Sequence, residues 1–237
     1  KIKVFCAKAA GVETPSLFPS AAKAIVRPAP RRRPHLPSRI DVVAIAVSTG
    51  GPNTLAEIFP VFPADFPVPI VVVQHMPPLF TQILAERLDA SSGLTVAEGR
   101  QGEILRPGQA WLAPGGYHMA VKRQGTLVGL QINEDPPENS CRPAADVLFR
   151  SVTQAYGANV LGVVLTGMGQ DGLRGSEHIR DAGGQILAQD EATSVVWGMP
   201  GYVTEAGLAD KVLPADQIGT AIVRAVTTRR TVSAGVM

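Results

Sequence analysis

The chain has 237 residues, of which 45% are hydrophobic and 18% are charged, and its formal net charge at pH 7 is +2. No apolar run approaches the roughly 18 residues that a membrane-spanning helix needs, and two cysteines make no disulfide framework. These features exclude a membrane-inserted protein and a disulfide-stabilised scaffold, and they fit a reducing cytoplasm. A charge this close to zero argues neither for nor against nucleic acid.

Residues 1–40 have the composition of a linker. The arginine cluster lies among prolines and small residues, and proline removes backbone donors and favours an extended chain. The opening "KIKVFCAKAA" reads like the end of a helix. We therefore expect an interdomain linker over residues 1–40, preceded by an N-terminal partner domain.

From residue 41 the pattern alternates between buried strands and helices. Near-continuous Val/Ile runs between helices predict a doubly wound, mostly parallel α/β sheet with helices on both faces. Residues 93–133 contain short alternating segments and Gly/Pro turns, which predict one or two antiparallel hairpins inserted in the fold. We expect this catalytic domain over residues 41–228, with a C-terminal tail over 229–237. The expected strands are 42–47, 70–73, 160–165 and 185–188, and the expected helices are 52–59, 79–88, 144–156, 175–182 and 215–226.

Three polar residues follow three of the buried runs: Ser48, His75 and Asp171. In an open parallel sheet the loops at the carboxyl ends of the strands gather on one edge, where ligands bind. A serine, a histidine and an aspartate on such an edge are the parts of an acyl-transfer triad. Spacing alone does not choose the acid, because Asp190 also follows a strand.

The chemistry requires each of these residue types. A serine hydroxyl is a weak nucleophile unless a base accepts its proton, and imidazole, with an ordinary pKa of about 6.5, can do so. A carboxylate fixes the imidazole tautomer and stabilises the imidazolium. The turn "STGGP" leads from Ser48 into a helix N-terminus, whose free N–H groups suit a developing oxyanion, and Gly50 and Gly51 permit close approach.

Other interpretations of the same residues remain open at this point. A serine before a helix is often an N-cap, and an aspartate in a Gly-rich turn often serves the turn itself. A Gly-rich turn between strand and helix can also cradle a phosphate, although "STGGPN" matches neither G-x-G-x-x-G nor G-x-x-x-x-G-K-[ST]. We expect no metal site, because no two histidines have ligand spacing; they are His35, His75, His118 and His178.

Six stretches together resemble the chemotaxis response-regulator protein-glutamate methylesterases. The resemblance extends from residue 41 to about residue 225. The matching stretches are "AVSTGGP" (46–52), "VVVQHMPPLFT" (71–81), "WLAPGGYHM" (111–119), "CRPAADVLFRSV" (141–152), "GVVLTGMGQDGLRG" (162–175) and "AQDEATSVVWGMP" (188–200).

The resemblance places the family's nucleophile on Ser48, its base on His75 and its acid on Asp171. It implies hydrolysis of glutamate γ-methyl esters on the cytoplasmic helices of methyl-accepting chemotaxis receptors, which releases methanol, and deamidation of receptor glutamines. It further implies a cytoplasmic protein with no cofactor, no metal, no nucleic-acid partner and no membrane insertion. An N-terminal receiver domain, phosphorylated by a histidine kinase, would be the partner domain.

Other residues near these motifs have candidate roles. We expect the backbone N–H groups near Thr49 and Met168 to form the oxyanion hole, with Gly50 beside them. Arg142 either attracts the acidic receptor surface or forms a structural salt bridge. His118 lines the cleft or completes a hairpin. Cys141 stands where the family often has a histidine, and we expect it to be structural and not a second nucleophile.

Overall fold

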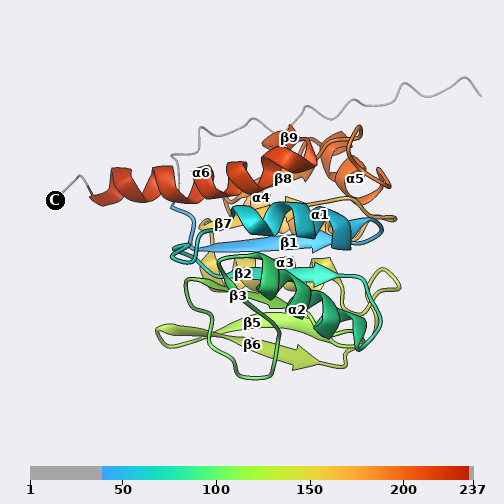
Figure 1. Ribbon diagram of the computed structural model, residues 1–237, viewed down its shortest axis with the longest axis horizontal. Coiled ribbons are helices and arrows are strands. Elements are labelled where there is room, and N and C mark those ends of the chain that lie inside the picture. Colours follow the sequence, from blue (N-terminus) through green and yellow to red (C-terminus); the bar gives the residue numbers. More distant parts are fainter. Residues whose placement is uncertain (1–38, 235–237) are drawn as a thin grey trace, which may run out of the picture. The chain divides into compact units, whose positions relative to one another are not determined.

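A seven-stranded sheet forms the centre of the computed structural model, which describes residues 39–234 and the side chains of residues 39–228 (Figure 1). Its strand order is β3-β4-β2-β1-β7-β8-β9, and every neighbouring pair is parallel. The strands are β1 (Val42–Val47), β2 (Ile70–Gln74), β3 (Thr95–Glu98), β4 (Gln109–Leu112), β7 (Val160–Val164), β8 (Gln185–Gln189) and β9 (Lys211–Leu213).

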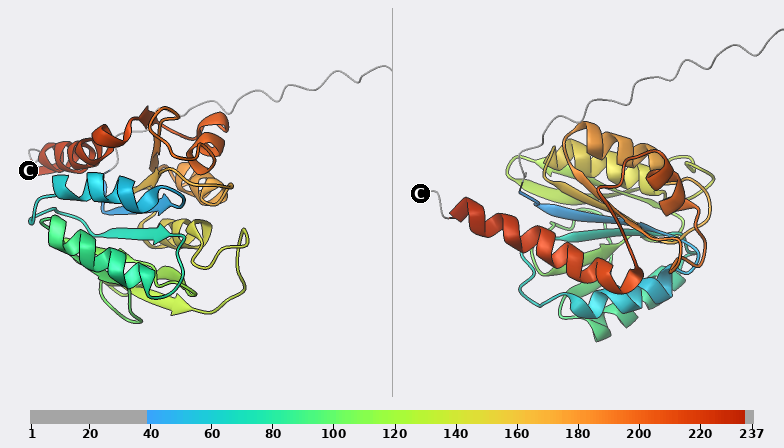
Figure 2. Two further views of the ribbon diagram at one scale, coloured as in Figure 1. Left: turned by 45° about the vertical axis from the view of Figure 1, so that its right-hand side comes forward. Right: turned by 90° about the horizontal axis from the view of Figure 1, so that it is seen from above.

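Helices cover both faces of this sheet (Figure 2). One face packs against α1 (Gly51–Ile58), the short 3₁₀ helix η1 (Phe59–Val61), α2 (Phe80–Ser91) and α6 (Ala215–Ala234). The other face packs against α3 (Ala145–Tyr156), α4 (Leu173–Asp181), α5 (Met199–Glu205) and the hairpin of β5 (His118–Gln124) and β6 (Leu127–Asn133). The prediction of a doubly wound sheet with a small antiparallel insertion is confirmed.

The central strand β1 shows why both faces need cover. All six of its side chains are fully buried, and successive side chains of a strand point to opposite faces. Val43, Ile45 and Val47 therefore lie in one core, and Val42, Ala44 and Ala46 lie in the other. A strand buried on both sides reads as a continuous apolar run, which made it predictable from sequence.

The prediction of one or two antiparallel hairpins over residues 93–133 is confirmed for one of them. β5 and β6 form that hairpin, whereas β3 and β4 are parallel members of the main sheet. β3 is an edge strand, and only Val96 of its four residues is buried. An edge strand alternates like a hairpin strand, so the period of two did not reveal its partner.

The boundaries of the folded body differ slightly from those expected. Ile40, one residue before the expected start, is fully buried in the core. Helix α6 continues to Ala234, beyond residue 228. The linker expected over residues 1–40 lies mostly outside the described residues, which begin at Arg39. None of the helices in the described part is both long and apolar enough to span a bilayer.

Close packing of α3 on α4 depends on Gly175. A Cβ added there would lie 2.4 Å from the Cβ of Phe149, a fully buried residue of α3. We expect Gly175→Ala to lower the free energy of unfolding by about 1–3 kcal/mol, because the two helices must separate. Urea denaturation measures this loss. Arg174→Ala, at an exposed position of the same helix, is the control and should change the stability far less.

Candidate active site

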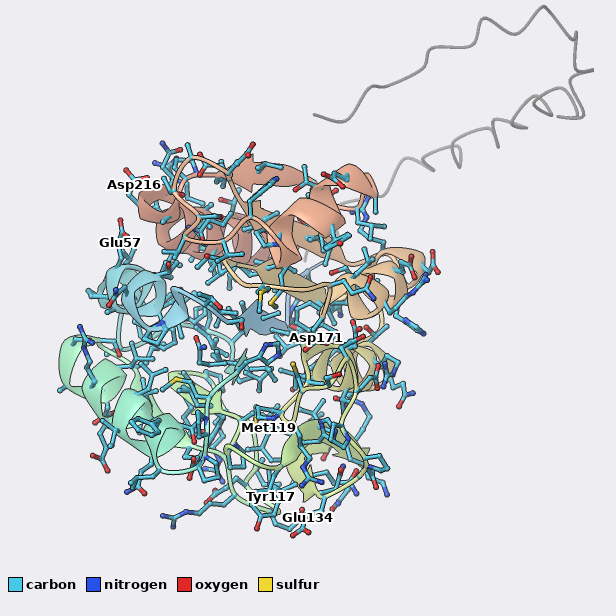
Figure 3. All side chains as sticks on the ribbon, turned by 90° about the vertical axis from the view of Figure 1, so that its right-hand side faces the viewer. Glu57, Tyr117, Met119, Glu134, Asp171 and Asp216 are labelled. Atoms are coloured by element: carbon cyan, nitrogen blue, oxygen red, sulfur yellow. The ribbon has the colours of Figure 1, made fainter. Side chains whose placement is uncertain are left out.

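The three residues of the predicted triad follow three adjacent strands. Ser48 comes directly after β1, His75 comes directly after β2, and Asp171 lies in the loop after β7. β1 pairs with β2 on one side and with β7 on the other, so the order of strands along the chain runs in opposite directions on the two sides of β1. A ligand crevice forms at such a switch point of a parallel sheet. Figure 3 looks onto this edge and shows Asp171 inside the molecule, with Tyr117 and Glu134 at its rim.

Asp171 receives hydrogen bonds on both carboxylate oxygens and is 2% exposed. Its Oδ2 lies 2.8 Å from His75 Nε2 and accepts the backbone N–H of Ala145 at 2.6 Å. Its Oδ1 accepts the backbone N–H of Asp146 and the side-chain amide of Asn139. Burial raises the pKa of Asp171, but the hydrogen bonds from His75 and from these backbone groups outweigh it and lower that pKa overall. Asp171 is therefore an ionised partner for the imidazole.

A second buried carboxylate, Asp146, lies behind Asp171. Burial raises the pKa of Asp146, the N–H of Gly175 opposes this effect, and the charge of Asp171 adds to it. The Asn139 amide nitrogen donates to both carboxylates, at 2.8 Å to Asp146 and 2.9 Å to Asp171. It thereby separates two like charges. The sequence analysis missed Asp146 and Asn139, because their role depends on a contact with Asp171 that no local pattern encodes.

The Asn139 turn is held against α3. Asn139 and Ser140 both have positive φ angles, of 52° and 61°, between paired residues Glu138 and Cys141. Two residues with positive φ match a type I′ hairpin turn, in which asparagine is favoured. A bidentate ion pair joins Glu138 to Arg150 of α3 with both distances at 2.6 Å. The dipeptide Asn-Ser is the signal that could have predicted this turn.

Ser48 sits in a turn whose backbone is fixed from two sides. Its N–H donates to the carbonyl of Thr166 at 3.0 Å, and the Thr166 hydroxyl donates to the carbonyl of Thr49 at 2.9 Å. The Ser48 carbonyl accepts the N–H of Gly51 and the side-chain amide of Gln74. The orientation of the nucleophile candidate is thus set by buried groups of β2 and of the loop after β7.

The loop that carries Met168 lies directly against Ser48. A Cβ added at Gly167 would approach the Cβ of Ser48 to 2.7 Å, so only glycine fits there. Met168, the next residue, is 72% exposed. Met168 thus directly follows the residue that packs against Ser48, and its pairing with Thr49 in an oxyanion hole stays a prediction.

The glycines of the "STGGP" turn have packing roles within the protein. A Cβ added at Gly50, which has a φ of 86°, would lie 2.6 Å from the Cβ of Val195. A Cβ added at Gly51 would lie 2.0 Å from Gln74 Oε1. Protein side chains thus occupy the space beside both glycines. The phosphate-cradle interpretation loses its main support, because packing accounts for the two glycines.

Cys141 contacts the other nitrogen of the His75 ring. Its Sγ lies 3.7 Å from His75 Nδ1, while Asp171 holds Nε2. Burial, and then the charge of Asp171, raise the pKa of the Cys141 thiol. The thiol therefore stays protonated at neutral pH and is a poor nucleophile. Sequence analysis did not place Cys141 beside the base, because the two residues are 66 positions apart and local patterns do not encode contacts over that separation.

The remaining candidates of the sequence analysis have structural partners. Arg142 Nη1 donates to the backbone carbonyls of Glu134 and Asp135, and Arg142 also lines a cleft of about 330 Å³ that includes His75 and Cys141. Arg142 can therefore brace its loop and still face the cleft.

Two further candidates form hydrogen bonds with residues outside the predicted triad. His118 is 1% exposed, and its Nδ1 accepts the N–H of Ala144, so it joins the hairpin to α3. Asp190 Oδ1 accepts the N–H and the hydroxyl of Thr193, so this carboxylate serves its own turn. No group of three or more metal-ligating side chains is found within residues 39–228.

Comparison with known proteins decides the family. The family described as CheB methylesterase matches residues 43–222 of the chain. The chain belongs to the CheB methylesterase family. The catalytic domain of the Thermotoga maritima CheB methylesterase has 43% sequence identity with it and a TM-score of 0.77, covering 79% of this chain and 99% of that domain.

CheB methylesterase relatives extend beyond the length of this chain. A protein-glutamate methylesterase/protein-glutamine glutaminase of Trichodesmium erythraeum is 50% identical over 224 residues, which are 94% of this chain and 63% of that protein. A protein of the same name from Moorella thermoacetica is 48% identical over 218 residues, which are 92% of this chain and 50% of that protein. The chain thus spans about half to two-thirds of the length of these relatives.

Cys141 offers a test of which side chain attacks in this CheB methylesterase family member. We expect Cys141→Ala to keep the rate of methanol release within about three-fold of the unmodified chain, because a half-buried, protonated thiol is a poor nucleophile. Methanol release from a glutamate γ-methyl ester measures the rate. Cys141→Ser, which keeps a hydroxyl beside His75, is the control. A loss of 100-fold or more in Cys141→Ala would instead identify the thiol as the attacking group.

Proposed function

We propose that the chain hydrolyses glutamate γ-methyl esters on the cytoplasmic helical region of methyl-accepting chemotaxis receptors and releases methanol. The observation that carries this proposal is the 2.8 Å contact between His75 Nε2 and Asp171 Oδ2, on the sheet edge where Ser48 directly follows β1. A base oriented by an ionised carboxylate beside a serine is the arrangement that acyl transfer requires. The names of the relatives support the choice of ester.

In the proposed mechanism Ser48 is the nucleophile, His75 the base and Asp171 the acid. Because Nε2 faces Asp171, its N–H donates to the carboxylate, and Nδ1 is the nitrogen that accepts the proton of the Ser48 hydroxyl. The thiol of Cys141 contacts Nδ1 and must give way to that hydroxyl. As Ser48 Oγ attacks the ester carbonyl, Asp171 stabilises the imidazolium that forms.

The negative charge on the substrate oxygen is stabilised by backbone N–H groups of Thr49 and Met168. Both belong to segments that pack against Ser48, and the hydrogen bond from Thr166 to the Thr49 carbonyl fixes the turn before the reaction begins. Donors held in place in this way need no reorganisation as charge develops. Gly50 and Arg142, which flank the site, are proposed to contact the substrate.

His75 then returns its proton to the leaving methoxide, and methanol departs. Water, deprotonated by His75, hydrolyses the glutamyl-serine ester and regenerates the Ser48 hydroxyl. A receptor glutamine can form the same acyl-enzyme and release ammonia. Deamidation is therefore proposed as a second activity of the same site.

The proposed setting is the cytoplasm, where the receptor helices are accessible. An N-terminal receiver domain, phosphorylated by a histidine kinase, is the proposed regulatory partner, and residues 1–40 are its proposed linker. The proposed reaction requires no cofactor, since nucleophile, base and oxyanion donors all come from the chain.

Methanol release from receptor membranes tests the proposal. The chain is incubated with membranes whose receptors carry radiolabelled methyl esters, and volatile label is collected over time. We expect label to be released as methanol, and we expect none from a chain inactivated by boiling. Mass spectrometry of receptor peptides should show glutamate in place of the ester. Stable esters after prolonged incubation with the folded chain would contradict the proposal.

A further inference from the structure

Gln74, the last residue of β2, joins the backbones of the two reacting residues. It is 2% exposed and follows four buried apolar residues, Ile70–Val73. Its Nε2 donates to the carbonyl oxygen of Ser48 at 2.9 Å and to that of His75 at 3.2 Å. One side-chain nitrogen thus contacts the main chain of both the proposed nucleophile and the proposed base.

The Gln74 amide lies at the point where the hydrogen bonds between β1 and β2 end. The last bond between β1 and β2 runs from the N–H of His75 to the carbonyl of Val47, at 3.2 Å. Beyond this bond the segment after β1 turns into α1 at Ser48, whereas the segment after β2 continues from His75 towards α2. Gln74 supplies the next connection, at the point where the two segments would otherwise separate.

The other atom of the amide shows that packing alone does not explain glutamine here. Gln74 Oε1 is buried and has no hydrogen-bond partner among the described residues. A buried acceptor without a donor is costly, and an apolar side chain of similar length would avoid that cost. The two bonds made by Nε2 are the feature that an apolar residue could not reproduce.

Gly51 leaves the space that this amide fills. A Cβ at Gly51 would lie 2.0 Å from Gln74 Oε1, and the φ of Gly51 lies outside the left-handed region. The missing Cβ therefore makes room for the amide and does not serve an unusual backbone conformation. Two residues from different segments, Gly51 and Gln74, are fitted to each other beside Ser48.

We propose that Gln74 is a positioning residue that fixes the separation of Ser48 from His75, and this inference rests on the proposed function. Attack requires the hydroxyl and the imidazole to stay within hydrogen-bond reach, and a displacement of about 1 Å can cost roughly 100-fold in rate. Tying the two carbonyls to one nitrogen limits that displacement. Gln74 itself does not touch the substrate in this role.

The first test replaces the amide without removing its volume. We expect Gln74→Met to lower kcat for methanol release by roughly 10- to 100-fold with KM unchanged, because receptor binding does not involve this buried residue. Gln185→Met is the matched control, since Gln185 is also a strand glutamine with a buried, unpartnered amide atom, at the start of β8. We expect its kcat to stay within two-fold of the unmodified chain.

Gly51→Ala disturbs the same contact from the other side. Its Cβ would lie 2.0 Å from Gln74 Oε1 and 2.5 Å from Val47 Cγ2, so the amide must move away from both carbonyls, and we expect a loss in kcat at least as large as in Gln74→Met. Thermal unfolding curves are recorded for every variant, and a melting temperature above the assay temperature establishes that the assayed chains are folded. A loss of kcat no larger than the loss in Gln185→Met, in both Gln74→Met and Gly51→Ala, would overturn the proposal.

A second readout does not depend on the substrate. The proton between His75 Nε2 and Asp171 should give a low-field NMR signal, and we expect Gln74→Met to speed its exchange with water by at least about ten-fold, because the backbone of His75 is less restrained. The Gln185→Met control should leave the exchange rate unchanged. If the unmodified chain releases no methanol, the proposed function fails, and this exchange rate alone decides the positioning role; an unchanged rate in Gln74→Met would then overturn it.

Discussion

Ser48→Ala is expected to reduce methanol release from methylated receptor membranes by roughly 10⁴- to 10⁶-fold while leaving the chain folded. The hydroxyl is the atom that forms the acyl-enzyme, and in serine hydrolases the loss of the nucleophile removes most of the catalytic rate. The Ser48 backbone groups bond to Thr166, Gly51 and Gln74, and alanine keeps these bonds. The melting temperature should therefore change little.

A matched serine makes this test specific. Ser194 lies in the loop after β8, where its hydroxyl donates to the carbonyl of Asp190, and Ser194→Ala should keep the rate within two-fold. Methanol release and circular dichroism are measured on both variants. Equal release by Ser48→Ala and the unmodified chain would mean that Ser48 only begins a helix and that another group attacks.

Asp171→Asn is expected to lower kcat by roughly 10⁴-fold, the size of effect that follows when a triad carboxylate becomes an amide. The amide cannot hold the His75 tautomer that donates from Nε2, so Nδ1 is no longer reliably the basic nitrogen. The control is Asp190→Asn, the carboxylate that sequence spacing could not separate from Asp171. Its carboxylate bonds to Thr193 and should be dispensable for the rate. A larger loss in Asp190→Asn than in Asp171→Asn would reverse the assignment of the acid.

The pH dependence of stability gives Asp171 an independent test. Its pKa is lowered in the folded chain relative to the unfolded chain, where an aspartate titrates near about 3.9. Its contribution to stability is therefore fully present above the unfolded pKa and is lost as the pH falls through the folded pKa. We expect the free energy of unfolding to fall below about pH 4, and to fall less steeply in Asp171→Asn. Identical slopes in urea titrations would contradict the lowered pKa.

The pH dependence of stability has the opposite sign for Asp146. Its pKa is raised in the folded chain, mainly by burial, so its ionisation opposes folding as the pH rises through the folded pKa. The Asn139 amide, which donates to both carboxylates, reduces their mutual repulsion. Asn139 thus lets two buried carboxylates lie close to each other in the folded chain.

The sequence by itself determined the elements that depend on local periodicity. The Val/Ile run of β1 and the helical face of α3 are visible as patterns, because a strand buried on both sides is continuously apolar and an amphipathic helix repeats every 3.6 residues. Ser48 and His75 were predicted as site residues because each lies within two residues of the end of such an apolar run. The resemblance of the motifs to the family then selected Asp171, and not Asp190, as the predicted acid of the triad.

The tertiary structure decided what depends on contacts between distant segments. Only the strand order places β3 and β4 in the main sheet, since an edge strand and a hairpin strand have the same period. Only the packing shows that Nε2 of His75 faces Asp171, that Cys141 lies on Nδ1, and that Asn139 bridges two carboxylates. Periodicity records which face of an element is buried, whereas hydrogen bonds between loops depend on how those elements pack, and for that reason the chemistry of the site was fixed by the fold.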